Sequence, residues 1–408
     1  MIVVFIISFF AYNFSIKYKL KFPYSRDSLL VWKLDEPGKS VTPSSFILDS
    51  NRKIIINSFT LDKNSHVQNK LFTDNCKQEY LWSCIFFIDT ESGKLKHSIR
   101  IEGGIFQMVD TKDYLYSAIS FSEIRNGRDG SKIIKINKDT YEIAIVWDGD
   151  TSISRLKTID KYISFEEHDY SSNNFTDYLY IINTVSGKVN KYPLDNKTNI
   201  LQISYEGPNK LKIFTDQESY FLYDIDQNQV LDQVTLSKFE QYKYLYNNVV
   251  SKDSSTVFYT DGIKVGAINK DEVLWEVSLH PEGEGSGEIP RIDDKPYVDE
   301  NNVYVATQFR QFYSLDKKTG KTNWVIDIPT SVGRNFEVYK NKAYFANFGF
   351  AFQPSGLGII DLEKGKLVHL EQPAGASDYW HDYGPIISPP YVYLQNDYSG
   401  IYEFRLVD

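Results

Sequence analysis

Residues 312–324 read "FYSLDKKTGKTNW" and contain Gly320-Lys321-Thr322, which resembles the end of a phosphate-binding loop. Such a loop also needs a glycine five residues before Gly320 and a following helix whose N-terminal amides face the phosphates. Leu315 occupies that glycine position, and the next residues, "NWVIDI", alternate and are β-branched, as in a strand. The stretch therefore predicts a turn between two strands and argues against a phosphate site.

The same pattern recurs along the chain. Clear copies are "FFIDTESGKL" from Phe86, "YIINTVSGKV" from Tyr180 and "GIIDLEKGKL" from Gly358. Weaker copies are "IKINKDTYEI" from Ile134, "LYDIDQNQVL" from Leu222 and "GAINKDEVLW" from Gly266. Each copy is a strand, an Asp or Asn that caps its own turn, a turn that often contains Gly-Lys, and a second strand. The predicted capping residues are Asp89, Asn137, Asn183, Asp226, Asn269, Asp316 and Asp361.

A repeat of about 45 residues with purely β character predicts a propeller of four-stranded blades. We label the strands of a blade A to D from the propeller axis outward, so that the repeated turn joins C to D. The composition agrees, because 15% of the residues are aromatic and Tyr and Phe favour strands. B strands are predicted to begin near Lys53, Tyr114, Tyr162, Lys212, Thr256, Asn302, Lys342 and Tyr391, which gives eight blades.

The last blade lacks a D strand in its own repeat. Phe404 takes the position of Leu315 and Arg405 that of Asp316, and the chain stops shortly afterwards. The missing strand is found at the other end, where "LLVWKLDEPG" from Leu29 resembles "KTNWVIDIPT", with Trp32 in the place of Trp324. We therefore predict an all-β, eight-bladed β-propeller of four-stranded antiparallel blades, whose ring is closed by the N-terminal strand and has no open sheet edge there.

The pattern Y-x-L-D-x-x-T-G-K-x-x-W, carried by Tyr313 to Trp324, resembles the repeat of the pyrroloquinoline-quinone (PQQ)-like propellers. The stretch "VWKLDEPGKSVTPSSFILDSNRKIIINS" also resembles the start of the non-enzymatic members, among them the propeller lipoprotein of the outer-membrane β-barrel assembly machinery. The resemblance covers about residues 29–406 and is stronger in blades 5 to 8 than in blades 2 to 4. It implies the architecture, whereas the function stays open because one fold hosts many functions.

The same family contains PQQ-dependent dehydrogenases, so an enzyme has to be considered. The resemblance to those enzymes would bring adjacent cysteines, calcium ligands and a catalytic Asp. Cys76 and Cys84 are not adjacent, no acidic cluster matches a calcium site, and tryptophan docking motifs are thinly represented among six tryptophans. We expect no cofactor, no metal and no catalytic residue. A PQQ-type or other cofactor-dependent oxidoreductase with an axial pocket is the alternative.

Two other features bound the environment of the protein. The net charge of −9 argues against a nucleic-acid partner. Cys76 and Cys84 are the only cysteines, and they form either a disulfide, if the domain is exported, or two free thiols.

Residues 1–16, "MIVVFIISFFAYNFSI", form an apolar segment that would span about 24 Å as a helix, against a bilayer core of about 30 Å. An uncleaved anchor, a poor signal peptide and a truncated start all remain open. Lys17, Lys19 and Lys21 favour a cytoplasmic propeller, whereas such a leader favours a membrane-anchored or exported one. We assign residues 17–27 to a linker and 28–408 to the propeller.

The longest irregular segments are predicted D-to-A and B-to-C loops, which share one face, and they include residues 280–296, 347–356 and 371–384. We expect a protein, peptide or glycan partner on this loop face. The predicted binding residues are Asp378, Tyr379, Trp380, His381, Asp382 and Tyr383, with Phe350 from the neighbouring loop. The alternative is that Trp380 and Tyr383 only cap the propeller channel by packing.

Overall fold

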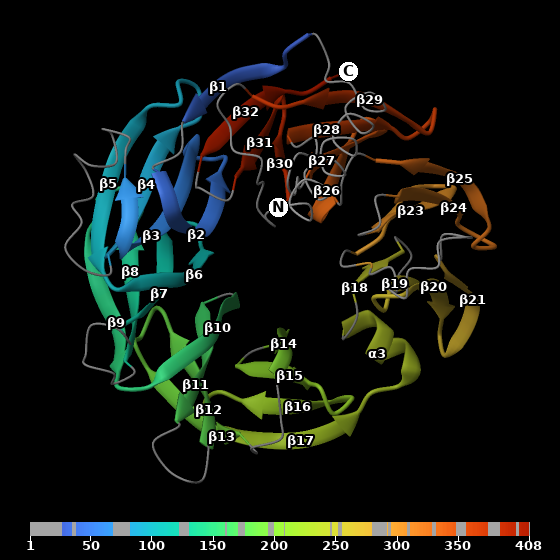
Figure 1. Ribbon diagram of the computed structural model, residues 1–408. Helices are drawn as coiled ribbons and strands as arrows, with labels where there is room; N and C mark the ends of the chain where they lie inside the picture. The colour runs from blue at the N-terminus through green and yellow to red at the C-terminus, as the bar shows by residue number, and fades with distance from the viewer. Residues whose placement is uncertain are drawn as a thin grey trace, which may run out of the picture. The chain divides into compact units, whose positions relative to one another are not determined.

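The computed structural model describes residues 27–34, 38–67, 82–121, 130–159, 161–169, 176–194, 200–207, 209–244, 247–251, 255–279, 292, 295–307, 311–328, 332–347, 356–373, 384–396 and 400–407. They form eight four-stranded antiparallel sheets, the blades of an eight-bladed β-propeller (Figure 1). The chain divides into two compact units of four blades each. The N-terminal unit is Pro37–Leu236, and the C-terminal unit is Ser237–Asp408 together with Met1–Glu36.

The N-terminal unit contains blades 1 to 4. Blade 1 is β2 (Gly38–Asp49), β3 (Ile54–Val67), β4 (Trp82–Asp89) and β5 (Leu95–Glu102). Blade 2 is β6 (Gly104–Asp110), β7 (Tyr114–Ser120), β8 (Ser131–Asn137) and β9 (Ile143–Gly149). Blade 3 is β10 (Ser152–Ile159), β11 (Tyr162–Asp169), β12 (Thr176–Asn183) and β13 (Val189–Leu194). Blade 4 is β14 (Ile200–Gly207), β15 (Lys210–Thr215), β16 (Ser219–Asp224) and β17 (Gln229–Thr235).

The C-terminal unit contains blades 5 to 8, preceded by the helix α3 (Lys238–Tyr244). Blade 5 is β18 (Asn247–Val250), β19 (Thr256–Thr260), β20 (Lys264–Asn269) and β21 (Glu272–Ser278). Blade 6 is β22 (Tyr297–Val298), β23 (Asn302–Thr307), β24 (Gln311–Asp316) and β25 (Thr322–Asp327). Blade 7 is β26 (Val332–Tyr339), β27 (Lys342–Asn347), β28 (Gly356–Asp361) and β29 (Lys366–Glu371). Blade 8 is β30 (Ile386–Ser388), β31 (Tyr391–Gln395), β32 (Ile401–Arg405) and β1 (Leu30–Leu34).

The predicted closure of the last blade is confirmed. β1 pairs antiparallel with β32, with Trp32 opposite Glu403 and Leu34 opposite Ile401 (Figure 1). The backbone N–H of Arg405 also donates to the carbonyl oxygen of Leu29 over 2.8 Å. The first described strand of the chain is thus the D strand of the last blade.

Burial follows the position of a strand within its blade. The C strand β28 is buried at every position, because its two faces are covered by neighbouring layers of side chains. The D strand β25 alternates between exposed and half-buried residues. This difference agrees with the sequences of the two strands, because "GLGII" of β28 is an uninterrupted run without polar side chains and "TNWVID" of β25 alternates.

The turn at Gly320 is a hairpin turn, as predicted. The Oδ1 atom of Asp316 accepts the backbone N–H of Lys318 over 3.1 Å and that of Thr319 over 2.8 Å. Gly320 has φ +70°, a region that glycine enters without steric cost, and its N–H donates to the Asp316 carbonyl over 2.8 Å. The predicted cap at Asp226 is wrong: β16 ends at Asp224, whose Oδ1 atom accepts the N–H of Gln227 over 2.9 Å.

Gly320 has a second reason to be glycine. A Cβ atom there would lie 2.6 Å from the ring of Trp275, which comes from the D strand of the preceding blade. The Trp275 Nε1–H also donates to the Lys317 carbonyl over 3.0 Å. In the same way, a Cβ atom at Gly365 of blade 7 would lie 2.9 Å from the ring of Trp324. The Trp of one blade therefore packs on the Gly of the next blade in both of these pairs.

Candidate functional site

The residues predicted to bind a partner lie outside the described part of the chain. This applies to Phe350 and to the six consecutive residues Asp378, Tyr379, Trp380, His381, Asp382 and Tyr383, so the loop-face site stays a prediction. The apolar segment 1–16 is also outside it. No helix among the described residues is long and apolar enough to cross a membrane.

One of the two cysteines lies in the described part of the chain. Cys84 is fully buried on β4 and takes part in a disulfide. Cys76 lies outside the described residues, so its pairing with Cys84 stays a prediction.

A cleft of about 720 Å³ lies between blades 5 and 6. One wall is the end of β18 with the start of β19, and the other is β22 with the turn that follows it. Because it involves the A-to-B and C-to-D turns, it opens on the side of the blades opposite the predicted loop face. The lining residues are Val249, Val250, Ser251, Thr256, Phe258, Tyr297, Val298, Asp299, Glu300 and Lys317.

Lys317 is the cation of this cleft, and it is half-buried. Its Nζ atom donates to the carbonyl oxygen of Asp299 over 2.9 Å and lies 5.7 Å from the centre of the Phe258 ring. An ammonium group has three N–H donors, so two remain for a ligand. Among the residues that the structure describes, no carboxylate forms an ion pair with Lys317.

The Asp299 carboxylate is occupied by its own turn. Its Oδ1 atom accepts the backbone N–H groups of Asn301 and Asn302 over 2.8 and 2.7 Å, and its Oδ2 atom accepts the Tyr304 hydroxyl over 3.0 Å. Burial tends to raise the pKa of Asp299, but these hydrogen bonds outweigh it and hold the pKa below the ordinary value. Glu300, in contrast, is exposed at the rim.

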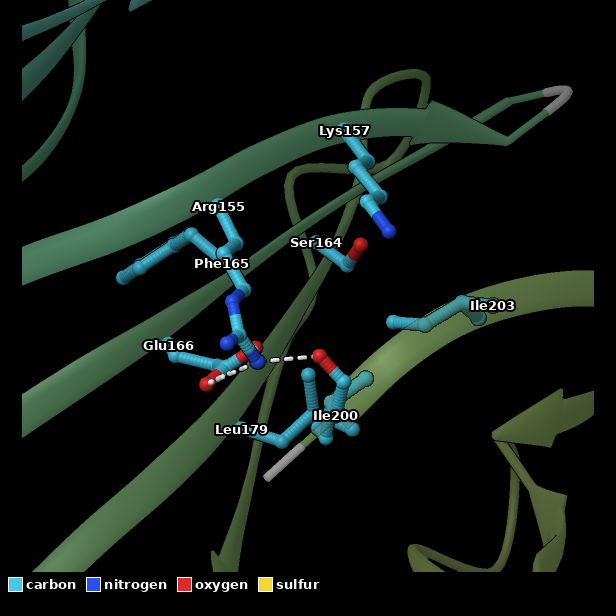
Figure 2. A pocket seen from close by; sticks show the side chains of 8 residues that line it. All are labelled: Arg155, Lys157, Ser164, Phe165, Glu166, Leu179, Ile200 and Ile203. Carbon is cyan, nitrogen blue, oxygen red and sulfur yellow. Dashed lines mark hydrogen bonds and ion pairs between the residues drawn. The ribbon is translucent and has the colours of Figure 1, made fainter. Parts of the chain in front are cut away.

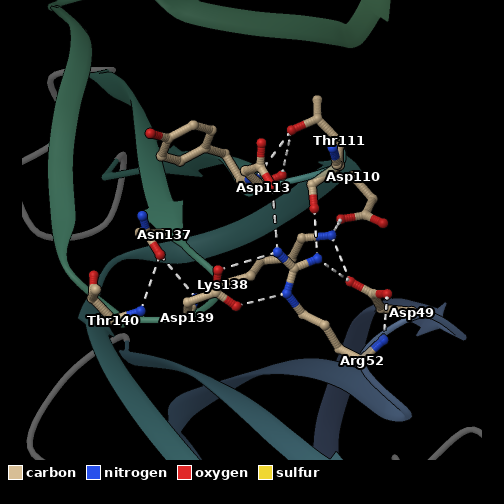
Figure 3. A network of polar contacts seen from close by, with 11 residues as sticks. Asp49, Arg52, Asp110, Thr111, Asp113, Asn137, Lys138, Asp139 and Thr140 are labelled. Atoms are coloured by element: carbon tan, nitrogen blue, oxygen red, sulfur yellow. Dashed lines mark hydrogen bonds and ion pairs between the residues drawn. The ribbon is translucent and has the colours of Figure 1, made fainter.

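The equivalent junction between blades 1 and 2 is filled by ion pairs (Figure 3). Lys138, which is 3% exposed, lies in the C-to-D turn of blade 2 at the position of Lys317. Its Nζ atom donates to Asp49 Oδ2 over 2.7 Å and to Asp110 Oδ1 over 2.8 Å. The equivalence follows from register, since the N–H of each lysine donates to the residue just before strand B, Asp113 or Asn301.

Arg52 extends this network at its surface side. Its guanidinium donates to Asp49, to Asp139 and to the Lys112 carbonyl, and it reaches Asp113 over 3.4 Å (Figure 3). Because Arg52 donates to Asp49 and not to Asp110, the pKa values of these two carboxyl groups shift in opposite directions although both accept hydrogen bonds from Lys138.

Burial tends to raise the pKa of both carboxyl groups. At Asp49 the hydrogen bonds from Lys138 and Arg52 outweigh burial and lower the pKa, whereas at Asp110 burial outweighs Lys138 and the pKa is raised. Of these two carboxyl groups, Asp49 is therefore the one that stays charged to lower pH.

Register also shows what replaces the two acids in blades 5 and 6. Asp49 is opposite the first residue of its B strand, Ile54, and Ser251 is hydrogen-bonded to the first residue of its own, Thr256. Asp110 comes one residue before Thr111, and Val298 one residue before Asp299. Thr111 and Asp299 make the same backbone bond to the start of strand B. Ser251 and Val298 thus stand where the filled junction has Asp49 and Asp110.

A second, smaller pocket lies between blades 3 and 4 (Figure 2). The Arg155 guanidinium, from a bulge in β10, donates to Glu166 Oε1 over 3.2 Å and to the Ile200 carbonyl. Burial raises the pKa of Glu166 and lowers that of Lys157, whose Nζ atom donates to the Leu201 carbonyl over 3.0 Å. The pocket has no volume for a water molecule, so it is a packed junction.

The same blade contains a Ser-His-Asp hydrogen-bond chain that the sequence did not reveal. Ser154 Oγ lies 2.7 Å from His168 Nε2, and His168 Nδ1 lies 2.8 Å from Asp177 Oδ1. The three residues come from three adjacent strands, so no local motif marks them. Acyl transfer also needs space beside the nucleophile and donors for an oxyanion. The three side chains bridge adjacent strands, and none of them lines the closed pocket of this blade.

The described residues hold no group of three or more His, Cys, Asp or Glu side chains that could bind a metal ion. Of the sites above, the blade 5–6 cleft alone combines open volume, apolar walls and a cation with spare donors. It is the candidate site of the described residues. The sequence gives little indication of it. Lys138 and Lys317 each follow the capping residue of their turn, and the sequence does not show that their partners differ.

Comparison with protein families gives one match. Residues 249–405 match the family described as "Outer membrane protein assembly factor BamB". The matched segment is less than half of the chain, and it begins at the cleft and ends in the last strand. The chain is thus a PQQ-like propeller that resembles the BamB family, as the sequence indicated. No curated protein matches the chain.

Solved structures support the fold at low identity. The chain resembles Sqt1 of Saccharomyces cerevisiae with a TM-score of 0.55 and 10% identity, over 93% of this chain and 100% of that one. The computationally designed Ika8 protein gives 0.54 and 11%, with the same coverage. Sqt1 of Chaetomium thermophilum, solved with the N-terminus of the ribosomal protein L10, gives 0.52 and 10%, over 93% and 100%.

Proposed function

We propose that the protein is a non-catalytic scaffold that binds a protein or peptide partner, with the cleft between blades 5 and 6 as one contact surface. The observation that carries this proposal is the open, mostly apolar space around Lys317. The equivalent junction between blades 1 and 2 is filled with ion pairs instead. Concave sites with apolar walls and a few polar groups are typical of ligand sites.

The comparisons support a binding role by analogy of fold. One structure of the same fold, Chaetomium Sqt1, was solved with a peptide segment of another protein. The matched family is described as an assembly factor.

The loop face remains a second proposed surface. Trp380→Ala should weaken binding of a protein, peptide or glycan partner by about 2 kcal/mol or more without unfolding the chain. Binding would be measured by calorimetry and folding by thermal melting. A variant that unfolds, while its folded fraction binds normally, would assign Trp380 to packing.

The scaffold proposal is tested on the full chain with a photo-reactive group at Val249, which lines the cleft, and a matched one at Val325, an exposed residue of an outer strand. Cross-linking in the native source should yield a specific adduct from Val249 only. Purified protein with PQQ and calcium should not reduce a dye, and a fluorophosphonate should not label Ser154. Dye reduction or labelling of Ser154 would favour the enzyme alternative.

A further inference from the structure

We propose that the blade 5–6 cleft recognises a carboxylate group attached to an apolar peptide segment, with Lys317 as its anchor. The inference rests on the proposed function, because it names the chemistry of the partner at the same cleft. The carboxylate can be the C-terminus of a chain or the side chain of Asp or Glu. These sources present the same group to Lys317 and are separated below by the choice of probe.

The protein contains an internal example of the proposed contact. In the junction between blades 1 and 2, Lys138 meets the carboxylates of Asp49 and Asp110 at 2.7 and 2.8 Å. Lys317 has the same place in its own blade, but Ser251 and Val298 replace the two acids. A ligand carboxylate between them would give Lys317 the partner that Lys138 receives from its own chain.

The surroundings of Lys317 select an apolar carrier for that carboxylate. Val249, Val250 and Val298 line the cleft, and Phe258 is 2% exposed. Tyr297 adds an aromatic ring that is 37% exposed. Burying an aliphatic or aromatic side chain here removes apolar surface from water on both partners. A small hydrophilic anion would leave these walls uncovered.

Two carboxylates of the cleft oppose the proposed ligand. Asp299 is the weaker competitor for Lys317, because its oxygens already accept hydrogen bonds from its own turn and only its carbonyl oxygen meets Nζ. Glu300 is exposed at the rim, where water and salt screen its charge. A half-buried cation with spare donors attracts a carboxylate more strongly than a screened rim charge repels it.

The probes are three acetylated tripeptides that differ only in the position of a carboxylate. Acetyl-Leu-Phe-Leu with a free C-terminus, acetyl-Glu-Phe-Leu amide and the uncharged acetyl-Leu-Phe-Leu amide would be titrated to millimolar concentration. Binding would be followed through the indole N–H signal of Trp275, which donates to the Lys317 carbonyl. One or both charged probes should shift this signal and the uncharged amide should not. The stronger of the two identifies the source of the carboxylate.

Variants assign the effect to Lys317. Lys317→Met should weaken the better charged probe by about tenfold or more, since a charged hydrogen bond is lost. The matched control is Lys318→Met, in the same turn but exposed, which should leave binding unchanged. Glu300→Gln should strengthen binding by removing a repelling charge.

Val298→Asp provides an independent test, because it restores the acid found at Asp110 and should occupy Lys317 from within the chain. It should abolish binding of the charged probes while the chain stays folded. The proposal is overturned if no charged probe shifts Trp275, if the uncharged amide binds equally well, or if Lys317→Met and Val298→Asp leave binding unchanged. In each of those cases a cross-linked partner at Val249 would still support the scaffold function, and its absence would contradict that function separately.

Discussion

The junction between blades 1 and 2 and the junction between blades 5 and 6 have the same backbone arrangement and a lysine at the same position. The first is filled by side chains, whereas the second is open. Lys138 is enclosed by Asp49 and Asp110, whereas Lys317 faces Ser251 and Val298 across a cleft of about 720 Å³. The residues at two positions of the repeat therefore distinguish the junction that is filled by ion pairs from the open cleft that we propose as a binding site. Lys138 forms two ion pairs within the chain, whereas the Nζ atom of Lys317 donates only to the Asp299 carbonyl among the described residues.

The two junctions also differ in how the outer strands meet the next blade. In blades 5 to 7, Trp275 and Trp324 lie over Gly320 and Gly365. In blade 1 the corresponding residue is His97, which stacks on Tyr141 with ring centres 4.0 Å apart. Tyr141 takes the glycine position at φ +61°. The N-terminal unit thus keeps the contact but changes its chemistry, which explains why its repeats are harder to recognise.

The largest expected effect is on the filled junction. Lys138→Met leaves Asp49 and Asp110 without their shared cation, and breaking a buried ion pair from one side costs about 3–5 kcal/mol of the free energy of unfolding. Urea denaturation at neutral pH would measure it. The matched variant Lys317→Met removes no ion pair and only one hydrogen bond, to the Asp299 carbonyl, so it should cost about 1 kcal/mol. Equal losses would show that the two lysines have the same role.

A smaller effect separates two glycines at the same place in the repeat. Gly320→Ala meets both a positive φ and the Trp275 ring, so it should cost about 2–3 kcal/mol. Gly187→Ala has φ +72° but no atom within 4 Å of the added Cβ, so about 1 kcal/mol from the backbone is expected. Thermal melting of both variants would test the contact. If the two costs agree, the tryptophan adds nothing to the requirement for glycine.

Titration should sharpen the same contrast. The folded-state pKa of Asp49 lies below its ordinary value of about 3.9, so its contribution is complete above that pH and is lost as the pH falls through the folded pKa. Asp110 shifts upward by burial and does not share this loss. The difference in unfolding free energy between the native chain and Lys138→Met should therefore shrink below about pH 4. A constant difference down to about pH 2 would contradict this assignment.

The sequence was sufficient for the fold and insufficient for the described site. Gly320, Trp324 and the capping aspartates carry the repeat because each satisfies a local requirement of turn geometry or blade contact, and local requirements can be read without a structure. The cleft depends on register across blades, since Ser251 and Asp49 become equivalent only when their strands are paired. The hydrogen bonds of His168 were missed for the same reason, as its partners lie on two other strands.

The smallest predicted effect repairs a position where the N-terminal unit lacks the aromatic contact. Ala144 is opposite Lys135, two residues before the capping Asn137, just as Trp324 is opposite Ser314, two residues before Asp316, and Ala144 is exposed. A Cβ atom added to Gly187 in the next turn would have nothing within 4 Å, so there is room for a ring above it. Ala144→Trp should therefore stabilise the chain by about 1 kcal/mol through apolar burial.

The control is Ile145→Trp, on the same strand and 61% exposed. Ile145 is opposite Ile134 and lies on the other face of β9, so this change should have little effect. A gain in melting temperature for Ala144→Trp alone would show that the tryptophan contact of blades 5 to 7 can be transferred. Equal changes in both variants would mean that any added aromatic surface on β9 acts alike.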